Sequence, residues 1–489
     1  MDIDDLKNLL SKGERVNVEC KESKSSIPND LYSTYSAFAN TNGGHIILGI
    51  KEDKSKSFPS ERFVYQGVQN AAKQISDFWN TINGNKVNCN ILTDDDVSLV
   101  EDGDTSFIVI HVPRANYQDK PIYVGENPLK GTYKRNNEGD YHATYDEIKA
   151  MIRDESSDGN DSMIVECSTM EEIDTQTLKR YRTIFDTLNP EHIWTPLNDK
   201  DFLEQIGGYR IDKKEKREGL TLAGFMMFGK GLAIRNEFSN VFMDYRDESS
   251  ATLDERWQDR LTYDGRWENN LFNFYTLVCP KLMTEIKRPF KLNGIQRIDD
   301  TPVHKAIREA FVNLLIHADY QLDAGTLKVI KTKNGFEFTN PGCLKIPRDQ
   351  IYHGGVSRPR NPHIQAMMRM IGFGDNIGSG FPAILAAWKS EGWIQPELKE
   401  DTVVNQVTLS LQMVKEEDKD PVSNLKISPN QEKLLKLIAK NPSITRAELA
   451  EKLGVSQTTI QKYISSLKKA SLLIRHGSDH VGYWEVKWI

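Results

Sequence analysis

Apolar and polar residues follow two different spacings in the first third of the chain, and each spacing predicts one kind of secondary structure. Alternation over residues 15–18 predicts a strand with Val16 and Val18 pointing inward, and Lys21 and Glu22 extend it. The same reasoning predicts a helix that ends at the Asn/Gly turn 40–44, strands over 46–50, 107–112 and 131–135, and a helix over 144–152. These elements predict a first domain that ends near residue 155.

The middle of the chain mixes helical and strand patterns. Helices are predicted over 174–188 and 199–206, the dense apolar run 220–230 fits either a helix or a strand in a core, and 241–245 predicts a strand. Residues 302–320 predict a helix, followed by a strand over 336–344. Glu309, Asn313 and His317 are four residues apart, so they share one face of that helix.

The last sixty residues have the pattern of a winged helix-turn-helix. Helical spacing over 430–440, a short helix over 445–453 that stops at Gly454, and a third helix capped by Ser456 are followed by strands over 472–475 and 483–486. The run Leu449–Ser456 resembles the corresponding run of bacterial winged-helix domains.

The third of these helices is the predicted recognition helix. Its outward Gln and Thr side chains can read base edges, and the nearby cations can pair with phosphates. The candidates for contact with nucleic acid are Gln457, Thr458, Thr459, Gln461, Lys462, Lys468, Lys469 and Arg475. A winged helix that serves dimerisation or protein docking is the alternative.

The length of the chain and two polar segments in it predict its division into domains. At 489 residues it is too long for one ordinary core and predicts about three or four domains. Linkers are predicted at 156–162 and 415–421. We therefore expect an α+β multidomain protein with domains at 1–155, 163–295, 296–414 and 425–489.

The charge and cysteine content of the chain bear on its partners and its compartment. The net charge of −7 does not favour a polyanion partner, but the last sixty residues carry 10 Lys and Arg against 5 Asp and Glu. The 5 cysteines are scattered without C-x-x-C spacing, which argues against a zinc ribbon or disulfide frame and for a reducing compartment. No apolar stretch approaches the roughly twenty residues that span a bilayer. The acidic start also lacks the order of a signal peptide. We expect a cytoplasmic protein without a membrane partner.

Acidic residues gather around the first two predicted strands. Glu14 and Glu19 flank the first strand, and Glu52 and Asp53 follow the second. If the strands lie side by side, Glu14, Glu19 and either Glu52 or Asp53 converge at one sheet edge. Three carboxylates around a small space can hold Mg²⁺ or Mn²⁺, which polarises a phosphodiester and activates a water. The alternative is that these acids are solvated charges at strand ends.

The same stretch resembles the Schlafen-type AlbA-like domain. That family's pattern is a Glu, four residues, Glu-hydrophobic-Lys, then Phe-Ala-Asn-Thr-x-Gly-Gly and a strand ending in acids. It is matched here by Glu14, Glu19–Lys21, Phe38–Gly44 and Gly49–Asp53.

This resemblance implies a nuclease site. Its catalytic residues would be Glu14, Glu19, Glu52 and Lys21. The metal ligands would be Glu14, Glu19 and Glu52, with Asp53 as an alternative. The resemblance also makes Lys134 and Arg135 candidates for phosphate contact. Many relatives are described as nucleic-acid binders or regulators, so contact with nucleic acid is implied more firmly than cleavage.

The helix predicted at 302–320 carries residues suited to a nucleotide site. An Asn amide oxygen can ligate Mg²⁺ while a Glu orients or deprotonates the attacking water. Residues 307–320 resemble the N-box of the divergent histidine-kinase-like (GHKL-like) ATPase domain, and later segments follow that family's order.

The resemblance implies an α/β sandwich that binds ATP. The residues it assigns to the cofactor are Glu309, Asn313, His317, Asn340, Gly342, Gly378 and Gly380, with Asn313 as a metal ligand. The turn 340–342 lacks the acid of the family's Asp-x-Gly-x-Gly loop, so ATP binding without hydrolysis is an alternative. A polar helix face that simply meets solvent is another.

Three functions follow from these domains. The first is a metal-dependent Schlafen-type endonuclease acting on RNA, transfer RNA included, or on DNA, regulated by nucleotide binding or oligomerisation, in bacterial anti-phage defence. The second is an ATP-responsive winged-helix transcriptional regulator without nuclease activity. The third is an assembly-forming ATPase scaffold. The expected cofactors are Mg²⁺ or Mn²⁺ and ATP, and the expected partners are nucleic acid and further copies of the chain.

Overall fold

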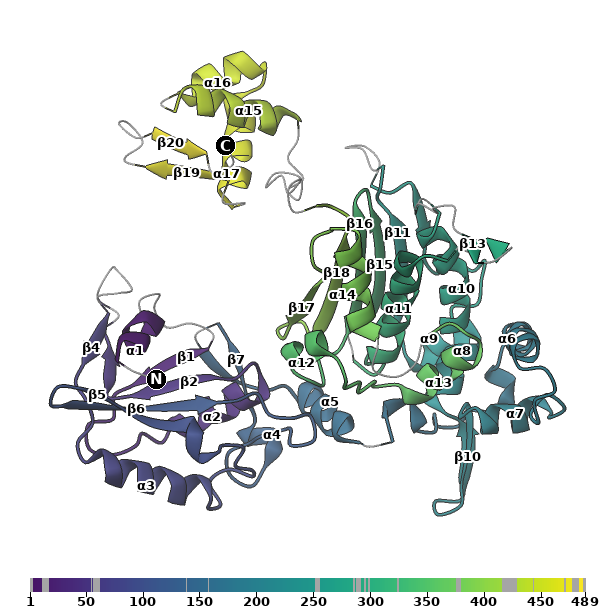
Figure 1. Ribbon diagram of the computed structural model, residues 1–489, viewed down its shortest axis with the longest axis horizontal. Coiled ribbons are helices and arrows are strands. Elements are labelled where there is room, and N and C mark those ends of the chain that lie inside the picture. Colours follow the sequence, from purple (N-terminus) through teal and green to yellow (C-terminus); the bar gives the residue numbers. More distant parts are fainter. Residues whose placement is uncertain are drawn as a thin grey trace.

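The computed structural model shows three regions of the chain, each folded around its own core (Figure 1). It describes the chain outside residues 1–2, 11–16, 54, 56–61, 138, 157, 251–255, 285, 287–291, 294–295, 298–299, 323–324, 375–379, 416–428, 443, 470–471, 477–482 and 487–489. The α+β multidomain fold class predicted from the sequence is confirmed.

The N-terminal domain is built on a four-stranded sheet in the order β1-β2-β6-β5. These strands are β1 (Val18–Lys21), β2 (Gly44–Leu48), β5 (Val97–Asp102) and β6 (Thr105–Val112). β1 and β2 run parallel because helix α2 (Leu31–Asn40) crosses between them, and the other pairs are antiparallel. The chain turns from α2 into β2 at Gly43, whose φ of +73° favours glycine.

Both faces of this sheet are covered. Helices α2 and α3 (Ala71–Ile82) bury Phe38 and Phe78 on one face. On the other face, Val18 and Cys20 pack against helix α1 (Ile3–Leu10) and the hairpin of β3 (Ile50–Glu52) and β4 (Phe63–Tyr65). Val18 therefore points inward as predicted, whereas Val16 lies outside the described residues.

The domain ends in a helix with the predicted capping box. The short helix α4 (Pro128–Gly131) precedes the hairpin of β7 (Tyr133–Asn136) and β8 (Gly139–His142), and helix α5 (Tyr145–Glu155) follows. The Glu147 amide donates to the Thr144 hydroxyl over 3.3 Å, and the Glu147 carboxylate accepts from the Thr144 amide over 2.8 Å. The strand predicted from 131 begins at 133, because residues 128–131 are helical.

The middle unit is built on a six-stranded sheet in the order β12-β11-β15-β16-β18-β17. Its strands are β11 (Phe242–Asp247), β12 (Asp259–Leu261), β15 (Thr326–Thr332), β16 (Gly335–Pro341), β17 (Glu397–Asp401) and β18 (Gln406–Gln412). Buried residues alternate with half-buried ones along β15 and β18, so the sheet has one fully buried face.

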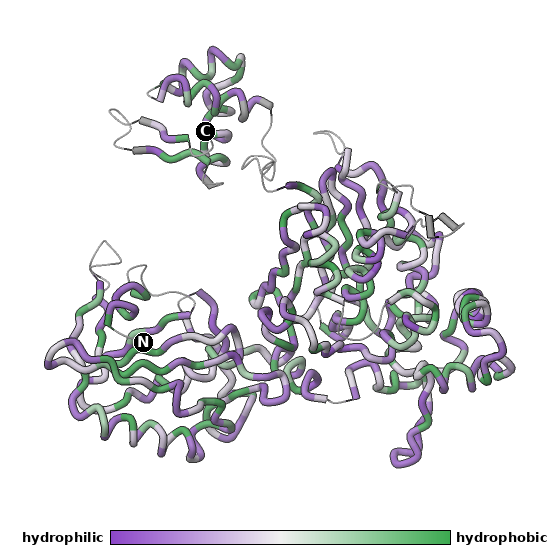
Figure 2. The backbone as a smooth tube through the Cα atoms, in the orientation of Figure 1, coloured by the Kyte–Doolittle hydropathy of each residue, from purple (hydrophilic) through white to green (hydrophobic). Residues whose placement is uncertain are grey.

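Helices cover that face and extend beyond it. They are α6 (Thr175–Leu188), α7 (Asp199–Gln205), α8 (Leu222–Phe228), α9 (Gly231–Glu237), α10 (Leu271–Leu282), α11 (Pro302–His317), α12 (Arg348–His353), α13 (Pro362–Met370) and α14 (Gly380–Ser390). Two small hairpins complete the unit, β9 (Tyr209–Asp212) with β10 (Arg217–Leu220) and β13 (Leu292–Asn293) with β14 (Gln296–Arg297). The run 220–230, open between helix and strand in sequence, contains helix α8. Figure 2 shows the tip of the β9–β10 hairpin as hydrophilic.

Residues on both sides of the predicted boundary at 295 share one sheet and one core. Strand β11 lies before the boundary and pairs in parallel with β15 beyond it, with Tyr245 opposite Val329. One cluster of buried side chains extends from Val165 to Leu411. The segments expected as separate domains at 163–295 and 296–414 therefore form one unit, because the later strands need β11 to complete their sheet.

The segment predicted as the first linker is packed into this unit. Asn160 and Asp161 are buried, and the Asp161 carboxylate accepts from the amide of Ile364 over 2.8 Å. The amide of Asn160 donates to the carbonyl of Arg360, also over 2.8 Å. Hydrogen bonds to distant residues thus fix a segment whose polar composition is typical of a loop.

The C-terminal region is the predicted winged helix-turn-helix. Its elements are α15 (Pro429–Lys440), α16 (Arg446–Leu453), α17 (Gln457–Lys469), β19 (Leu473–His476) and β20 (Tyr483–Val486). Leu434, Ile460 and Trp484 are buried in its core. Gly454 ends α16 with a φ of +65°. Among all the helices that the structure describes, none is long and apolar enough to cross a membrane.

We expect Val329→Ala to destabilise the whole middle unit by about 2 kcal/mol, because two buried methyl groups are lost and a cavity remains. Urea unfolding measures the loss. Hydrogen exchange in helices α6 to α10 should rise together with exchange in β15 to β18. Val403→Ala is the matched control, because Val403 is 59% exposed. Independent unfolding of residues 163–285 would contradict the single unit.

Candidate functional site

A cavity of about 130 Å³ lies between helix α11 and the sheet strands β16, β17 and β18. Helix α11 contributes Glu309, Asn313 and His317, which are half-buried on one face as their spacing predicted. Strand β16 contributes Asn340, and Gly380 begins helix α14. Five of the seven residues predicted to bind the cofactor thus line one cavity. Gly378 lies outside the described residues.

The walls of this cavity differ in character. The sheet and helix α14 present apolar side chains, namely Phe338, Phe381, Leu398, Val407 and Leu409. Lys345, Ser357 and Arg358 add polar and cationic groups. An apolar wall suits a flat base, and cations suit phosphate oxygens.

Helix α14 begins directly against Glu309. A Cβ placed on Gly380 would lie 2.1 Å from a Glu309 carboxylate oxygen. A larger residue at position 380 would therefore displace the carboxylate that faces the cavity.

The charge state of His317 is set by its surroundings. Burial, together with the positive charges of Arg360 and Lys345, lowers the pKa of His317 to about 4. The ring is therefore neutral at pH 7 and can donate or accept a hydrogen bond. Burial and the neighbouring arginines also lower the pKa of Lys345 to about 8, although Asp154 opposes the shift.

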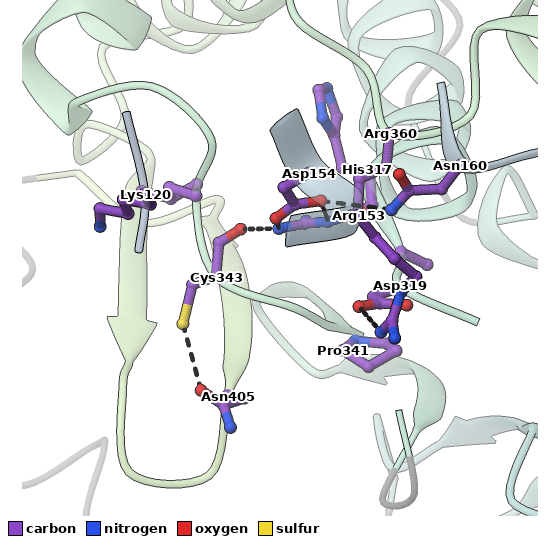
Figure 3. A network of polar contacts seen from close by, with 12 residues as sticks. Lys120, Arg153, Asp154, Asn160, His317, Asp319, Pro341, Cys343, Arg360 and Asn405 are labelled. Atoms are coloured by element: carbon purple, nitrogen blue, oxygen red, sulfur yellow. Dashed lines mark hydrogen bonds and ion pairs between the residues drawn. The ribbon is translucent and has the colours of Figure 1, made fainter. Parts of the chain in front are cut away.

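Arg360 joins this cavity to the N-terminal domain (Figure 3). Its guanidinium donates two hydrogen bonds to Asp154 of α5, over 2.8 and 2.6 Å. It also donates to the carbonyls of His317 and Cys343, over 2.8 and 2.6 Å. Arg360 is buried, and burial disfavours its charge, but Asp154 raises its pKa.

Gly342, predicted to bind the cofactor, instead lies against Arg360. Its φ is +96°, and a Cβ there would lie 2.8 Å from an Arg360 nitrogen. It lines a second, smaller cavity and not the one beside α11. The glycine is needed because the guanidinium approaches the backbone closely.

The predicted acidic site does not form among the described residues. Glu14 lies outside them, and within them no three His, Cys, Asp or Glu side chains gather to hold a metal ion. The Glu19 carboxylate instead accepts hydrogen bonds from Arg135 over 2.9 Å and from Lys21 over 3.2 Å. Its charge is thus balanced by cations. Cleavage by Glu14, Glu19 and Glu52 remains a prediction.

The other acidic-site residues have separate contacts. Lys21, predicted as catalytic, donates to Asp30 over 2.8 Å. Glu52 lies 3.9 Å from Arg62, and Asp53 accepts hydrogen bonds from Ser55. Glu52 is opposite Phe63 in the β3–β4 hairpin, and Phe63 packs in the core cluster on the α1 side.

The cations predicted to contact phosphate in the N-terminal domain are used inside the protein. The Arg135 side chain is 1% exposed and also pairs with Asp140 over 2.9 Å. The Lys134 ammonium donates to Glu147 and to the carbonyl of Thr402, over 2.6 and 2.7 Å. Both cations are therefore already paired within the protein, and contact with nucleic-acid phosphate by either residue stays a prediction.

The winged helix presents its predicted contact residues to solvent. Gln457, Thr458, Gln461, Lys462 and Lys468 are exposed, and Thr459 is half-buried. The Thr459 amide donates to the hydroxyl of Ser456 over 3.2 Å, which caps α17. The Arg475 guanidinium lies 4.7 Å from the Trp484 ring centroid, at the wing. Three side chains that can read bases and two lysines are therefore exposed to solvent on the same helix.

Sequence reasoning missed the residues that join the two domains. The guanidinium of Arg114 donates to Glu400 over 2.9 Å, although the residues are 286 positions apart. Asp154 and Lys120 were missed as well. The sequence offered no signal for these residues, because each is an isolated charge whose partner lies on a distant segment.

Four family models match successive stretches of the chain. Residues 14–144 match "Schlafen, AlbA_2", and residues 149–244 match "Domain of unknown function (DUF8451)". Residues 327–409 match "Putative ATP-dependent DNA helicase recG C-terminal", and residues 427–473 match "Winged helix-turn-helix DNA-binding". The Schlafen, ATPase-like and winged-helix resemblances are thereby confirmed. Together, these domains indicate a nucleic-acid-binding protein.

Two solved structures are similar to the chain. The DIP2311 protein from Corynebacterium diphtheriae is 18% identical with a TM-score of 0.40, and the similarity covers 99% of this chain and 96% of that one. The N-terminal domain of a RecG-related protein from Nitrosomonas europaea is 22% identical with a TM-score of 0.22, covering 27% of this chain and 85% of that one. No curated protein matches the chain.

His317 should make stability depend on pH. Its pKa is about 4 in the folded protein and about 6.5 when exposed. Between these values the unfolded state binds more protons, so stability falls as pH decreases through this window. In urea unfolding, the free energy of unfolding of the wild type should fall between about pH 7.5 and about pH 5. We expect this fall to be about 2 kcal/mol smaller in His317→Gln. His353→Gln, at an exposed position, should retain the full dependence. Equal pH dependence in His317→Gln and wild type would contradict the assignment.

Proposed function

We propose that this chain is a nucleotide-responsive DNA-binding regulator, in which the cavity beside α11 binds ATP and the winged helix binds duplex DNA. One observation carries the proposal: Glu309, Asn313, His317, Asn340 and Gly380 come from three elements and line the same cavity. Their residue types suit a nucleotide with its metal ion. The family matches support the two binding functions separately.

The cavity's residues fit ATP with Mg²⁺. Oxygen donors are the ligands that Mg²⁺ prefers, and Asn313 and Glu309 supply them on one helix face. The apolar sheet wall would take the adenine, while Lys345 and Arg358 would meet phosphates. A bound Mg²⁺ would neutralise phosphate charge. Neutral His317 adds a hydrogen bond without adding charge.

Arg360 gives the cavity a direct connection to the N-terminal domain. The carbonyls of His317 and Cys343 belong to residues that line the cavity, and Arg360 holds both while it holds Asp154 of α5. A nucleotide that shifts the end of α11 would therefore act on the contact with α5. This is the route by which we expect occupancy of the cavity to alter the placement of the N-terminal domain.

Metal-dependent cleavage in anti-phage defence is the second candidate. It is favoured by the Schlafen match, which begins at Glu14 and includes Glu19 and Glu52. We rank it second because Glu19 is paired with Arg135 and Lys21.

Asn313→Ala should weaken ATP binding by at least about tenfold, because a metal or phosphate contact is lost. Isothermal titration with ATP and Mg²⁺ measures the change. Asn334→Ala is the matched control, because Asn334 is exposed in the β15–β16 turn. Equal ATP affinity in wild type and Asn313→Ala would contradict a nucleotide site beside α11.

Lys462→Ala should weaken duplex DNA binding and reduce the slope of log K against log salt by about 0.9, the value for one phosphate contact. Gln457→Ala should instead relax sequence preference, because it removes a base contact. Fluorescence anisotropy over a salt series distinguishes the two effects, and Lys433→Ala on α15 is the control.

Adding ATP and Mg²⁺ to the same binding assay tests the response to nucleotide. We expect ATP to shift the affinity of the wild type and to leave Asn313→Ala unchanged. Mn²⁺-dependent cleavage of the DNA or of added RNA, abolished by Glu19→Gln, would replace the regulator with the nuclease.

A further inference from the structure

A second cavity, of about 70 Å³, lies where the N-terminal domain meets the middle unit. The N-terminal domain contributes Asn40, Arg114, Tyr117, Lys120 and Lys134. The middle unit contributes the segment 342–345, which also lines the cavity beside α11 from residue 343 onward. The two cavities are therefore neighbours across one stretch of backbone.

Most charges around this second cavity are matched in pairs. Four cations bind four carboxylates one to one, with shortest nitrogen–oxygen distances of 2.5 to 2.9 Å. The pairs are Arg114 with Glu400, Lys134 with Glu147, Arg153 with Asp319, and Arg360 with Asp154. Three of these pairs join the two units, the Lys134–Glu147 pair lies within the N-terminal domain, and the four together leave no net charge.

Lys120 and Lys345 also line this cavity, and neither belongs to these four ion pairs. The Lys120 ammonium donates to the carbonyl of Asn40 over 2.8 Å, and the Lys345 ammonium lies 4.4 Å from the Tyr117 ring centroid. Neither lysine forms an ion pair with any carboxylate in the described part of the chain. Figure 3 shows Lys120 on one side of Cys343 and the Arg360–Asp154 pair on the other. The cavity therefore carries two uncompensated ammonium groups, one from each domain.

The surroundings disfavour the charged forms of both lysines. Burial and Arg114 lower the pKa of Lys120 to about 7, and burial with the nearby arginines lowers that of Lys345 to about 8. Asp154 and Glu400 oppose these shifts only in part, because each is already paired with an arginine. An anion in the cavity would restore both lysines to their charged forms.

We propose that this cavity binds a phosphate-type oxyanion between the ammonium groups of Lys120 and Lys345, and so joins the two domains. The cavity has about half the volume of the one beside α11, which suits a small tetrahedral anion. The anion is either free phosphate or the terminal phosphate of a nucleotide in the neighbouring cavity. The site goes beyond the proposed function, since free phosphate can bind whether or not the chain binds ATP.

The test is isothermal titration of the full chain with inorganic phosphate, at ionic strength held constant with chloride. We expect Lys120→Gln and Lys345→Gln each to weaken phosphate binding by about tenfold, the effect of losing one charged hydrogen bond. Lys120→Arg should retain binding. Lys130→Gln, at an exposed position of α4, is the matched control. Thermal melting without ligand checks that each variant is folded.

Titrations with ATP and with ADP identify the source of the anion. If it is the terminal phosphate, Lys120→Gln weakens ATP binding about tenfold and leaves ADP binding unchanged. If it is free phosphate, only the inorganic phosphate titration changes. The proposal is overturned if folded Lys120→Gln binds phosphate and ATP as the wild type does. It is also overturned if the wild type binds neither.

Discussion

The guanidinium of Arg360 lies buried between α5, the end of α11 and the segment after β16, where it donates four hydrogen bonds. Taking such a charge out of water is costly, so the arrangement persists only while Asp154 and both carbonyls are in place. Losing any one of them would leave a buried donor without a partner. The position of the N-terminal domain against the cavity beside α11 therefore depends on this contact.

Local pattern was enough to predict elements whose stability comes from near neighbours. Helix α11 and the winged helix follow from apolar spacing, and the Thr144–Glu147 capping box follows from residues three apart. Strand β11 was recognised as a strand, but its pairing with β15 was not predicted because about eighty residues separate them. Parallel pairing carries no local signature in sequence.

Charged residues were the least predictable part of the candidate sites. Arg135 and Lys134 have the composition of an exposed strand, yet β8, α5 and the middle unit supply acceptors for both. Glu19 has the spacing of a metal ligand, yet Arg135 reaches its carboxylate from a strand more than 110 positions away. Whether a charge faces solvent depends on what the rest of the chain packs over it. The polar face of α11 was predictable because its three residues lie on one helix, whose geometry alone places them on the same face.

Glu147 has two tasks that share one carboxylate. It closes the capping box of α5 through the Thr144 amide, and it accepts a hydrogen bond from Lys134. Fraying of the first turn of α5 would release Lys134, and movement of Lys134 would weaken the cap, so the two events are thermodynamically linked. Because Lys134 also donates to the carbonyl of Thr402 in the middle unit, amide protection at the start of α5 is linked to this contact between the two units.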